Sequence, residues 1–248
     1  MSLKSIIHGL WYVEIVIQTI LAIVVIVRKS WRDLPGFSSY ILFAATASLV
    51  KYAISPAHNS NAYFYAYWIT EAVAIVLGLV VVREIFMKLF APHLALRKLA
   101  RLIFRVAIIL LVTFGFVVMY AQAPSAQNFY KVAMIGEEAT RIVEVGLIMF
   151  LFLSSGAFGL HWRQGIFGIA LGFGIFTSVE LVMLAVFLRI GPAAGPAFSI
   201  ARLVAFSLSL LVWLGYLLAP ERITAGAEMP KRAQLEQWNQ AVLELISK

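Results

Sequence analysis

Residues 6–27 read IIHGLWYVEIVIQTILAIVVIV, and this stretch decides the fold class. Its length matches the about 20 apolar residues that a helix needs to cross a hydrocarbon core of about 30 Å. The stretch is too long for the apolar region of a cleavable leader. Arg28 and Lys29 follow it without a small-residue cleavage site. It therefore predicts a transmembrane helix.

Further apolar segments of this length follow along the chain, separated by short breaks rich in proline, glycine and asparagine. Strands of a membrane β-barrel would be shorter and would alternate polar with apolar residues, which these segments do not. We therefore predict an all-α, polytopic membrane protein, a bundle of seven transmembrane helices. The predicted helices are 7–27, 36–54, 62–87, 100–121, 131–154, 164–188 and 197–219.

The composition of the 248 residues agrees with this class. Apolar residues make up 62% of the chain and charged residues 13%, against about 45–50% and about 25% in ordinary soluble domains. Mean hydropathy is +0.92. We expect one bundle domain, residues 1–220, and a cytoplasmic tail, residues 221–248. The absence of cysteine excludes disulfides, thiolate catalysis and zinc–thiolate sites.

The net charge of +8 lies mostly at the helix ends, so it indicates lipid headgroups rather than nucleic acid as the partner. With the N-terminus outside, 14 basic residues fall on the cytoplasmic side and 4 on the outer side. The lipid bilayer is therefore the predicted partner, with the C-terminus in the cytoplasm and the protein in a bacterial inner membrane. The cytoplasmic residues are Arg28, Lys29, Arg32, Arg83, Lys88, Arg97, Lys98, Arg101, Arg105, Arg163, Arg222, Lys231, Arg232 and Lys248, and the outer ones are Lys4, Lys51, Lys131 and Arg189.

The tail carries one further pattern. In residues 231–247, apolar side chains recur at helical spacing after Lys231 and Arg232. This amphipathic helix is expected to lie on the cytoplasmic leaflet. Docking on a cytoplasmic or membrane protein partner is the alternative. The tail is too short to form a kinase or another output domain.

A weak internal repeat is also predicted. A shift of 130 residues aligns Val13 and Glu14 with Val143 and Glu144 without a gap. The first three and the last three predicted helices would then form two parallel units joined by the fourth helix.

Aromatic residues gather at 63–68, in the sequence Tyr-Phe-Tyr-Ala-Tyr-Trp. This run favours a belt at the outer membrane interface, where amphipathic rings meet the headgroups. A ligand cage is the less favoured interpretation.

Away from the cytoplasmic helix ends, the charged side chains inside the predicted helices lie in the outer half of the bilayer or at its midplane. A charge in a bilayer costs several kcal/mol unless it is paired or hydrated, so each needs an explanation. Six acids face three cations there, and this excess is to be met by water, by protonation of some carboxyls or by a cationic ligand. The acids are Glu14, Glu71, Glu137, Glu138, Glu144 and Glu180, and the cations are Lys51, Arg141 and Arg202.

Helical spacing places Glu137, Arg141 and Glu144 on one face of their helix, with Glu138 at its edge. These residues and their counterparts on other helices predict a ligand-binding site in the outer half of the bundle. An ion-pair network that only fixes helix packing is the alternative. The predicted site comprises Glu14, Glu71, Glu138, Arg141, Glu144, Glu180 and Arg202.

No motif assigns chemistry to the chain. The four histidines are scattered over helix ends and loops, so no metal site is predicted, and no nucleophile elbow, P-loop or dinucleotide fingerprint occurs. The sequence therefore names no catalytic residue and leaves any cofactor unknown.

Seven helices with an outer N-terminus resemble the microbial rhodopsins and the seven-helix sensor regions of bacterial membrane histidine kinases. A rhodopsin needs a lysine in its seventh helix for the retinal Schiff base. The stretch 198–218 has none, and Arg202 does not form that bond. The resemblance to the sensor regions covers architecture and polar placement only, and the kinase is missing.

Three hypotheses on function follow. The first is a membrane binding or sensing module with an outward-facing charged site for a proton or a cationic ligand. Nothing in the sequence argues for an enzyme. The second is a small proton- or cation-coupled secondary transporter. Its three-plus-one-plus-three arrangement is similar to that of SWEET-type sugar transporters, although the Pro-Gln motif of related families is absent. The third is a structural or accessory subunit of a larger membrane complex.

Overall fold

The computed structural model describes residues 3–54, 60–91, 94–121, 126–157 and 164–219. Within these ranges it contains seven α-helices, one short 3-10 helix and no strand, which confirms the predicted all-α class. The amphipathic helix predicted at 231–247 lies outside the described residues. The helices are α1 (Leu3–Val27), α2 (Pro35–Ile54), α3 (Ser60–Leu89), α4 (Leu94–Ala121), α5 (Ala126–Ala157), α6 (Gln164–Ile190), η1 (Pro192–Ala194) and α7 (Gly195–Leu218).

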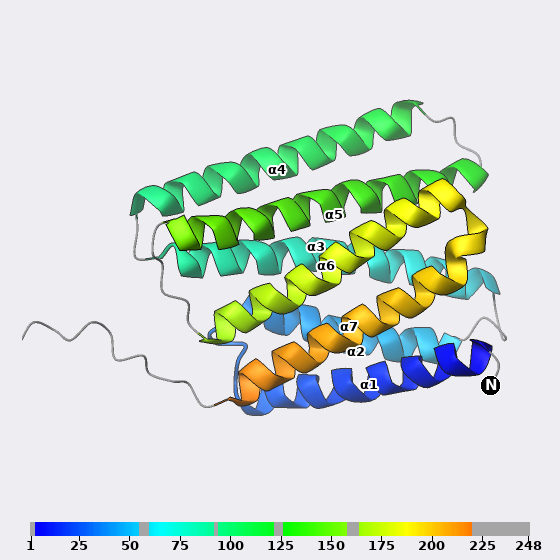
Figure 1. Ribbon diagram of the computed structural model, residues 1–248, viewed down its shortest axis with the longest axis horizontal. Helices are drawn as coiled ribbons and strands as arrows, with labels where there is room; N and C mark the ends of the chain where they lie inside the picture. The colour runs from blue at the N-terminus through cyan, green and yellow to red at the C-terminus, as the bar shows by residue number, and fades with distance from the viewer. Residues whose placement is uncertain (1–2, 55–59, 92–93, 122–125, 158–163, 220–248) are drawn as a thin grey trace, which may run out of the picture.

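The seven α-helices run side by side along the long axis of the molecule and alternate in direction (Figure 1). Helices α1, α3, α5 and α7 therefore begin at one end of the bundle, which we call the N-terminal end. Six helices form a closed ring in the order α1, α2, α3, α5, α6 and α7, because each packs on the next and α7 packs on α1. Helix α4 lies outside this ring, against α3 and α5.

Five helices within the described residues are long and apolar enough to cross a membrane: α1, α2, α5, α6 and α7. Their outer surfaces are also apolar. Val16, Ile23, Leu153 and Val182, for example, are each more than half exposed. Helices that are apolar both inside and outside a bundle are typical of a lipid environment. These features indicate an integral membrane protein.

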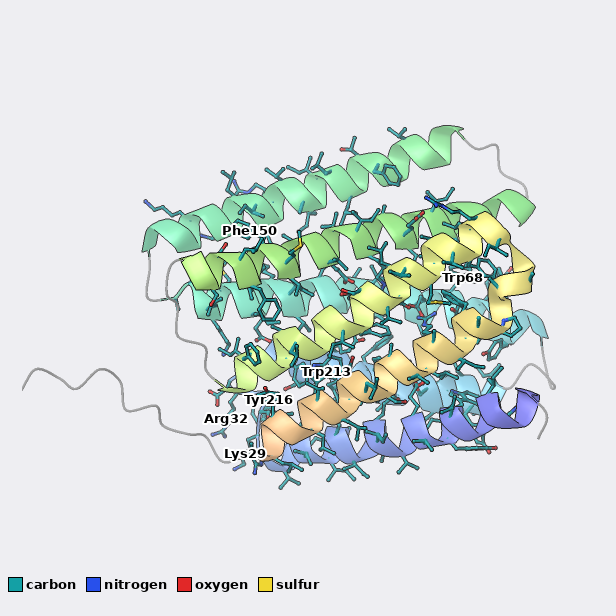
Figure 2. All side chains as sticks on the ribbon, viewed as in Figure 1. Lys29, Arg32, Trp68, Phe150, Trp213 and Tyr216 are labelled. Atoms are coloured by element: carbon teal, nitrogen blue, oxygen red, sulfur yellow. The ribbon has the colours of Figure 1, made fainter. Side chains whose placement is uncertain are left out.

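Helices α6 and α7 pack through two glycines. A Cβ atom at Gly172 would lie 2.2 Å from Trp213 Nε1, and one at Gly168 would lie 2.2 Å from the Tyr216 ring. The Gly-x-x-x-Gly pair thus makes room for two aromatic rings of α7, both labelled in Figure 2. Trp213 Nε1 donates to the carbonyl of Ile169 (3.1 Å), so the indole is fixed in place.

An aromatic layer fills the core of the ring in the half away from the N-terminal end. We define it as Phe37, Tyr40, Phe173 and Trp213. The Trp213 ring centre lies 5.4 Å from that of Phe37 and 5.0 Å from that of Phe173, which in turn lies 5.0 Å from that of Tyr40. All four side chains are buried. The layer therefore fills the inside of the bundle with packed rings at this level, and Tyr40 lies at its border with the cavity described below.

Polar side chains satisfy helix termini at the same end. The Glu84 carboxylate accepts hydrogen bonds from the backbone N–H groups of Gly36 (3.3 Å) and Phe37 (3.0 Å), so α3 caps the first turn of α2. Arg28 donates to the carbonyl of Leu217 at the end of α7. These charges have structural roles.

Candidate functional site

A partly open cavity of about 400 Å³ lies inside the ring of six helices. On α1 its lining extends from Ile7 to Gln18, or about 16 Å of a helix about 37 Å long at a rise of 1.5 Å per residue. The cavity therefore occupies the half of the bundle toward the N-terminal end. Its volume is in the range of small-molecule sites, about 300–1,000 Å³. Its polar lining residues include His8, Glu14, Gln18, Ser48, Lys51, Thr70, Glu71, Arg141, Ser199 and Arg202.

Aromatic rings form much of the remaining wall. Tyr63 and Tyr67 of α3 line the cavity together with Trp11 and Phe198. Tyr65, between the two tyrosines, is 65% exposed on the outer surface. The aromatic run at 63–68 thus divides between the cavity and the surface. The interface belt stays a prediction, and Tyr63 and Tyr67 have the further role of lining the cavity.

Arg141 of α5 lies at the inner limit of the cavity, where it contacts four carboxylates. Its Nη1 is 2.7 Å from Glu144 Oε2, and its Nε is 2.8 Å from Glu180 Oε2 on α6. Its Nη2 is 3.5 Å from Glu71 Oε1 on α3 and 4.0 Å from Glu137 Oε1. All five side chains are nearly inaccessible. The predicted face of α5 is therefore directed inward, where it connects α5 to α3 and α6.

Arg202 of α7 bridges two of the same carboxylates from the other side. Its Nη2 is 2.5 Å from Glu71 Oε1, and its Nε is 2.9 Å from Glu180 Oε1. Its Nη1 also donates to the Tyr67 hydroxyl (2.8 Å). We call the two arginines and Glu71, Glu137, Glu144 and Glu180 the two-arginine cluster. It connects α3, α5, α6 and α7 through charged contacts.

The cluster requires a glycine on α3. A Cβ atom at Gly78 would lie 2.8 Å from Glu144 Oε1. A glycine there lets the fully buried Glu144 carboxylate approach α3 while it holds Arg141, and a larger residue would have to displace that carboxylate.

Gly78→Ala is therefore expected to lower stability, by about 1–3 kcal/mol, because the added methyl group displaces a buried, ion-paired carboxylate. Gly146→Ala on α5 is the control, since a Cβ atom there meets nothing within 4 Å. Alanine in a helix interior usually stabilises relative to glycine. Thermal unfolding in detergent should show opposite or clearly unequal shifts, and equal shifts would contradict this packing.

The predicted site residues fall into three groups. The two-arginine cluster contains Glu71, Arg141, Glu144, Glu180 and Arg202. Glu14 lines the cavity nearer the N-terminal end of the bundle. Glu138 is half-buried and neither lines the cavity nor pairs with either arginine within the described residues. Its neighbour Glu137 joins the cluster instead, because α5 turns the stripe 137, 141 and 144 toward α3 and α6.

Several lining residues were not in the predicted site. Gln18 follows Glu14 by one helical turn, and Lys51 and Tyr67 face the cavity from α2 and α3. Lys51 Nζ lies 5.7 Å from the centre of the Tyr67 ring. The spacing of Glu14 and Gln18 was a usable signal, since residues four apart share a helix face.

Glu71, Glu137 and Glu180 also offer carboxylate oxygens within 4.8 Å of one another. Three such oxygens are a possible cation site. Here both guanidinium groups contact members of this trio, so a divalent ion would lie against two positive charges. We therefore assign no metal to the cluster.

Comparison of the chain with protein-family models, with curated proteins and with solved structures gives no match. The function is therefore argued from the cavity and the cluster.

Proposed function

We propose that the protein is an integral membrane binding or sensing module whose ligand cavity opens to the outside of a bacterial inner membrane. In this proposal all seven helices span the bilayer, since α3 and α4 lie alongside the other five along the same axis. The excess of basic residues toward the end marked by Lys29 and Arg32 in Figure 2 supports a cytoplasmic location for that end. The N-terminal end, with the cavity, then lies outside.

The observation that carries the proposal is that the cavity ends on a charged cluster that joins four helices. Glu71, Arg141 and Arg202 belong to both the cavity wall and the cluster. A ligand or proton that changes the charge balance there changes the forces between α3, α5, α6 and α7. Interhelical shifts of this kind are a common form of signal. The cytoplasmic tail is the segment proposed to report the shift.

The cluster also differs from a fully satisfied structural network. Four carboxylates face two guanidinium groups in it. Within the described residues, Glu137 Oε1 and Glu144 Oε1 accept no hydrogen bond, whereas each oxygen of Glu180 lies within 2.9 Å of an arginine Nε. Polar networks with unsatisfied members are costly to bury. This cost favours a responsive site over a purely structural one.

The aromatic layer argues against the alternative of a transporter. A transporter needs a path to both sides, and the layer fills the bundle below the cavity with Trp213 and Phe37 fully buried. Transport would require these rings to separate. An accessory subunit would not need a charged cavity of ligand size. The three-plus-one-plus-three repeat stays a prediction.

Single cysteines test the orientation on which this function depends, because the natural chain has none. In intact cells, Asn59→Cys and Ala126→Cys are expected to react with a membrane-impermeant maleimide. Ala95→Cys is expected to react only after permeabilisation. The reverse pattern would show that the cavity faces the cytoplasm. The protein could then not bind a ligand from outside the cell.

A further inference from the structure

One corner of the cavity offers hydrogen-bond acceptors without a cation. Glu14 and Gln18 lie one turn apart on α1, and both line the cavity. Their side chains are well buried, with residue exposures of 8% and 2%. Gln18 Nε2 donates to Glu14 Oε1 (3.2 Å). Because the amide nitrogen must face the carboxylate, the amide oxygen faces elsewhere. That oxygen is buried and has no hydrogen-bond donor within the described residues.

The charge of this corner is also unpaired. Glu71 is held by two arginines, whereas Glu14 forms no ion pair with any lysine or arginine in the described ranges. Lys51 lines the same cavity and lies over the Tyr67 ring, and among the described residues no ion pair joins it to Glu14. A buried carboxylate without a cation is unfavourable. The corner is therefore complementary to a group that carries both a positive charge and N–H donors.

Aromatic rings in the wall of the same cavity extend this complementarity. Trp11 lies on the same helix, and Phe198 and Tyr63 come from α7 and α3. Aromatic faces attract cations and also bury hydrocarbon. A divalent metal would instead require about six oxygen ligands, and this corner offers one carboxylate and one amide.

We propose that the cavity binds a small organic ammonium ion, with the ammonium N–H groups donating to the Glu14 carboxylate and to Gln18 Oε1. The hydrocarbon part lies against the aromatic wall. The inference deepens the proposed function and rests on it, since it names the class of ligand that the outward-facing site takes. It also gives Glu14 a role distinct from the two-arginine cluster, namely recognition of the ligand's charge.

The test uses three probes of similar size: 2-phenylethylammonium, 3-phenylpropionate and 2-phenylethanol. Titration calorimetry on the purified full chain in detergent is expected to show binding of the ammonium compound alone. Glu14→Gln keeps the shape and removes the charge, and it should weaken binding by about tenfold to a hundredfold. Gln18→Leu should weaken it less. Glu138→Gln, an acid outside the cavity, should bind as the wild type does.

Melting temperatures measured without ligand identify variants that do not fold. If Glu14→Gln does not fold, Glu14→Asp serves as a second test, because it keeps the negative charge but changes its position. Equal binding of the neutral alcohol would overturn the inference, as would unchanged affinity in Glu14→Gln. Binding of the carboxylate compound, lost in Lys51→Met, would overturn the ammonium assignment and leave the proposed function standing. Failure of all three probes at millimolar concentration would count against the ammonium site. The proposed function fails separately, if the cavity proves closed to the exterior.

Discussion

Replacing Arg141 with leucine is expected to destabilise the bundle by about 3–5 kcal/mol, the usual cost of removing one partner from a buried ion pair. Arg141 lies within 2.7 Å of Glu144 and 2.8 Å of Glu180, and both carboxylates are completely buried. Leucine would leave them without their central cation. Thermal unfolding of the purified protein in detergent measures the loss.

Arg189→Leu provides the matched control, because Arg189 is exposed at the end of α6. Exposed charges contribute about 0–1 kcal/mol, so its melting temperature should be close to that of the wild type. A further substitution of Glu144→Gln in the Arg141→Leu chain should recover part of the loss, since it removes one stranded charge. Equal shifts for the two arginine variants would show that Arg141 does not hold the cluster.

The sequence predicted the helices well, because long apolar segments between turn residues leave few alternatives in a bilayer. The structure lengthens several of them. The prediction 62–87 becomes Ser60–Leu89, and 131–154 becomes Ala126–Ala157. The added turns contain polar residues such as Ser60, Asn61, Gln127 and Asn128, which lower the local hydropathy, so hydropathy alone stops short of them. Membership of a helix was therefore easier to predict than its ends.

The sequence predicted which candidate residues share a face of one helix, but not which residues of different helices contact each other. Periodicity correctly placed Arg141 and Glu144 on one face of α5. It did not show that Arg202 would reach Glu71, which lies 131 residues away in sequence. Nor did it predict that the Glu84 carboxylate of α3 would cap the first turn of α2. Spacing defines a face, whereas only the packing of the bundle decides what that face meets.

The central claim is that the cavity is open to the exterior and ends on the two-arginine cluster. Cysteine accessibility tests it in intact cells, and the expected effect is large. Ser48 and Ser199 line the cavity from α2 and α7. Ser209 is completely buried outside the lining and donates to the carbonyl of Gly172 (2.8 Å). Each serine is replaced by cysteine in the otherwise cysteine-free chain.

A small, membrane-impermeant methanethiosulfonate added outside is expected to modify Ser48→Cys and Ser199→Cys readily. Modification of Ser209→Cys should be slower by roughly tenfold or more, because it requires local opening of the packed core. If Ser48→Cys and Ser199→Cys instead react only when the reagent enters from the cytoplasm, or are as unreactive as Ser209→Cys, the cavity does not open outward and the proposed sensing function is wrong.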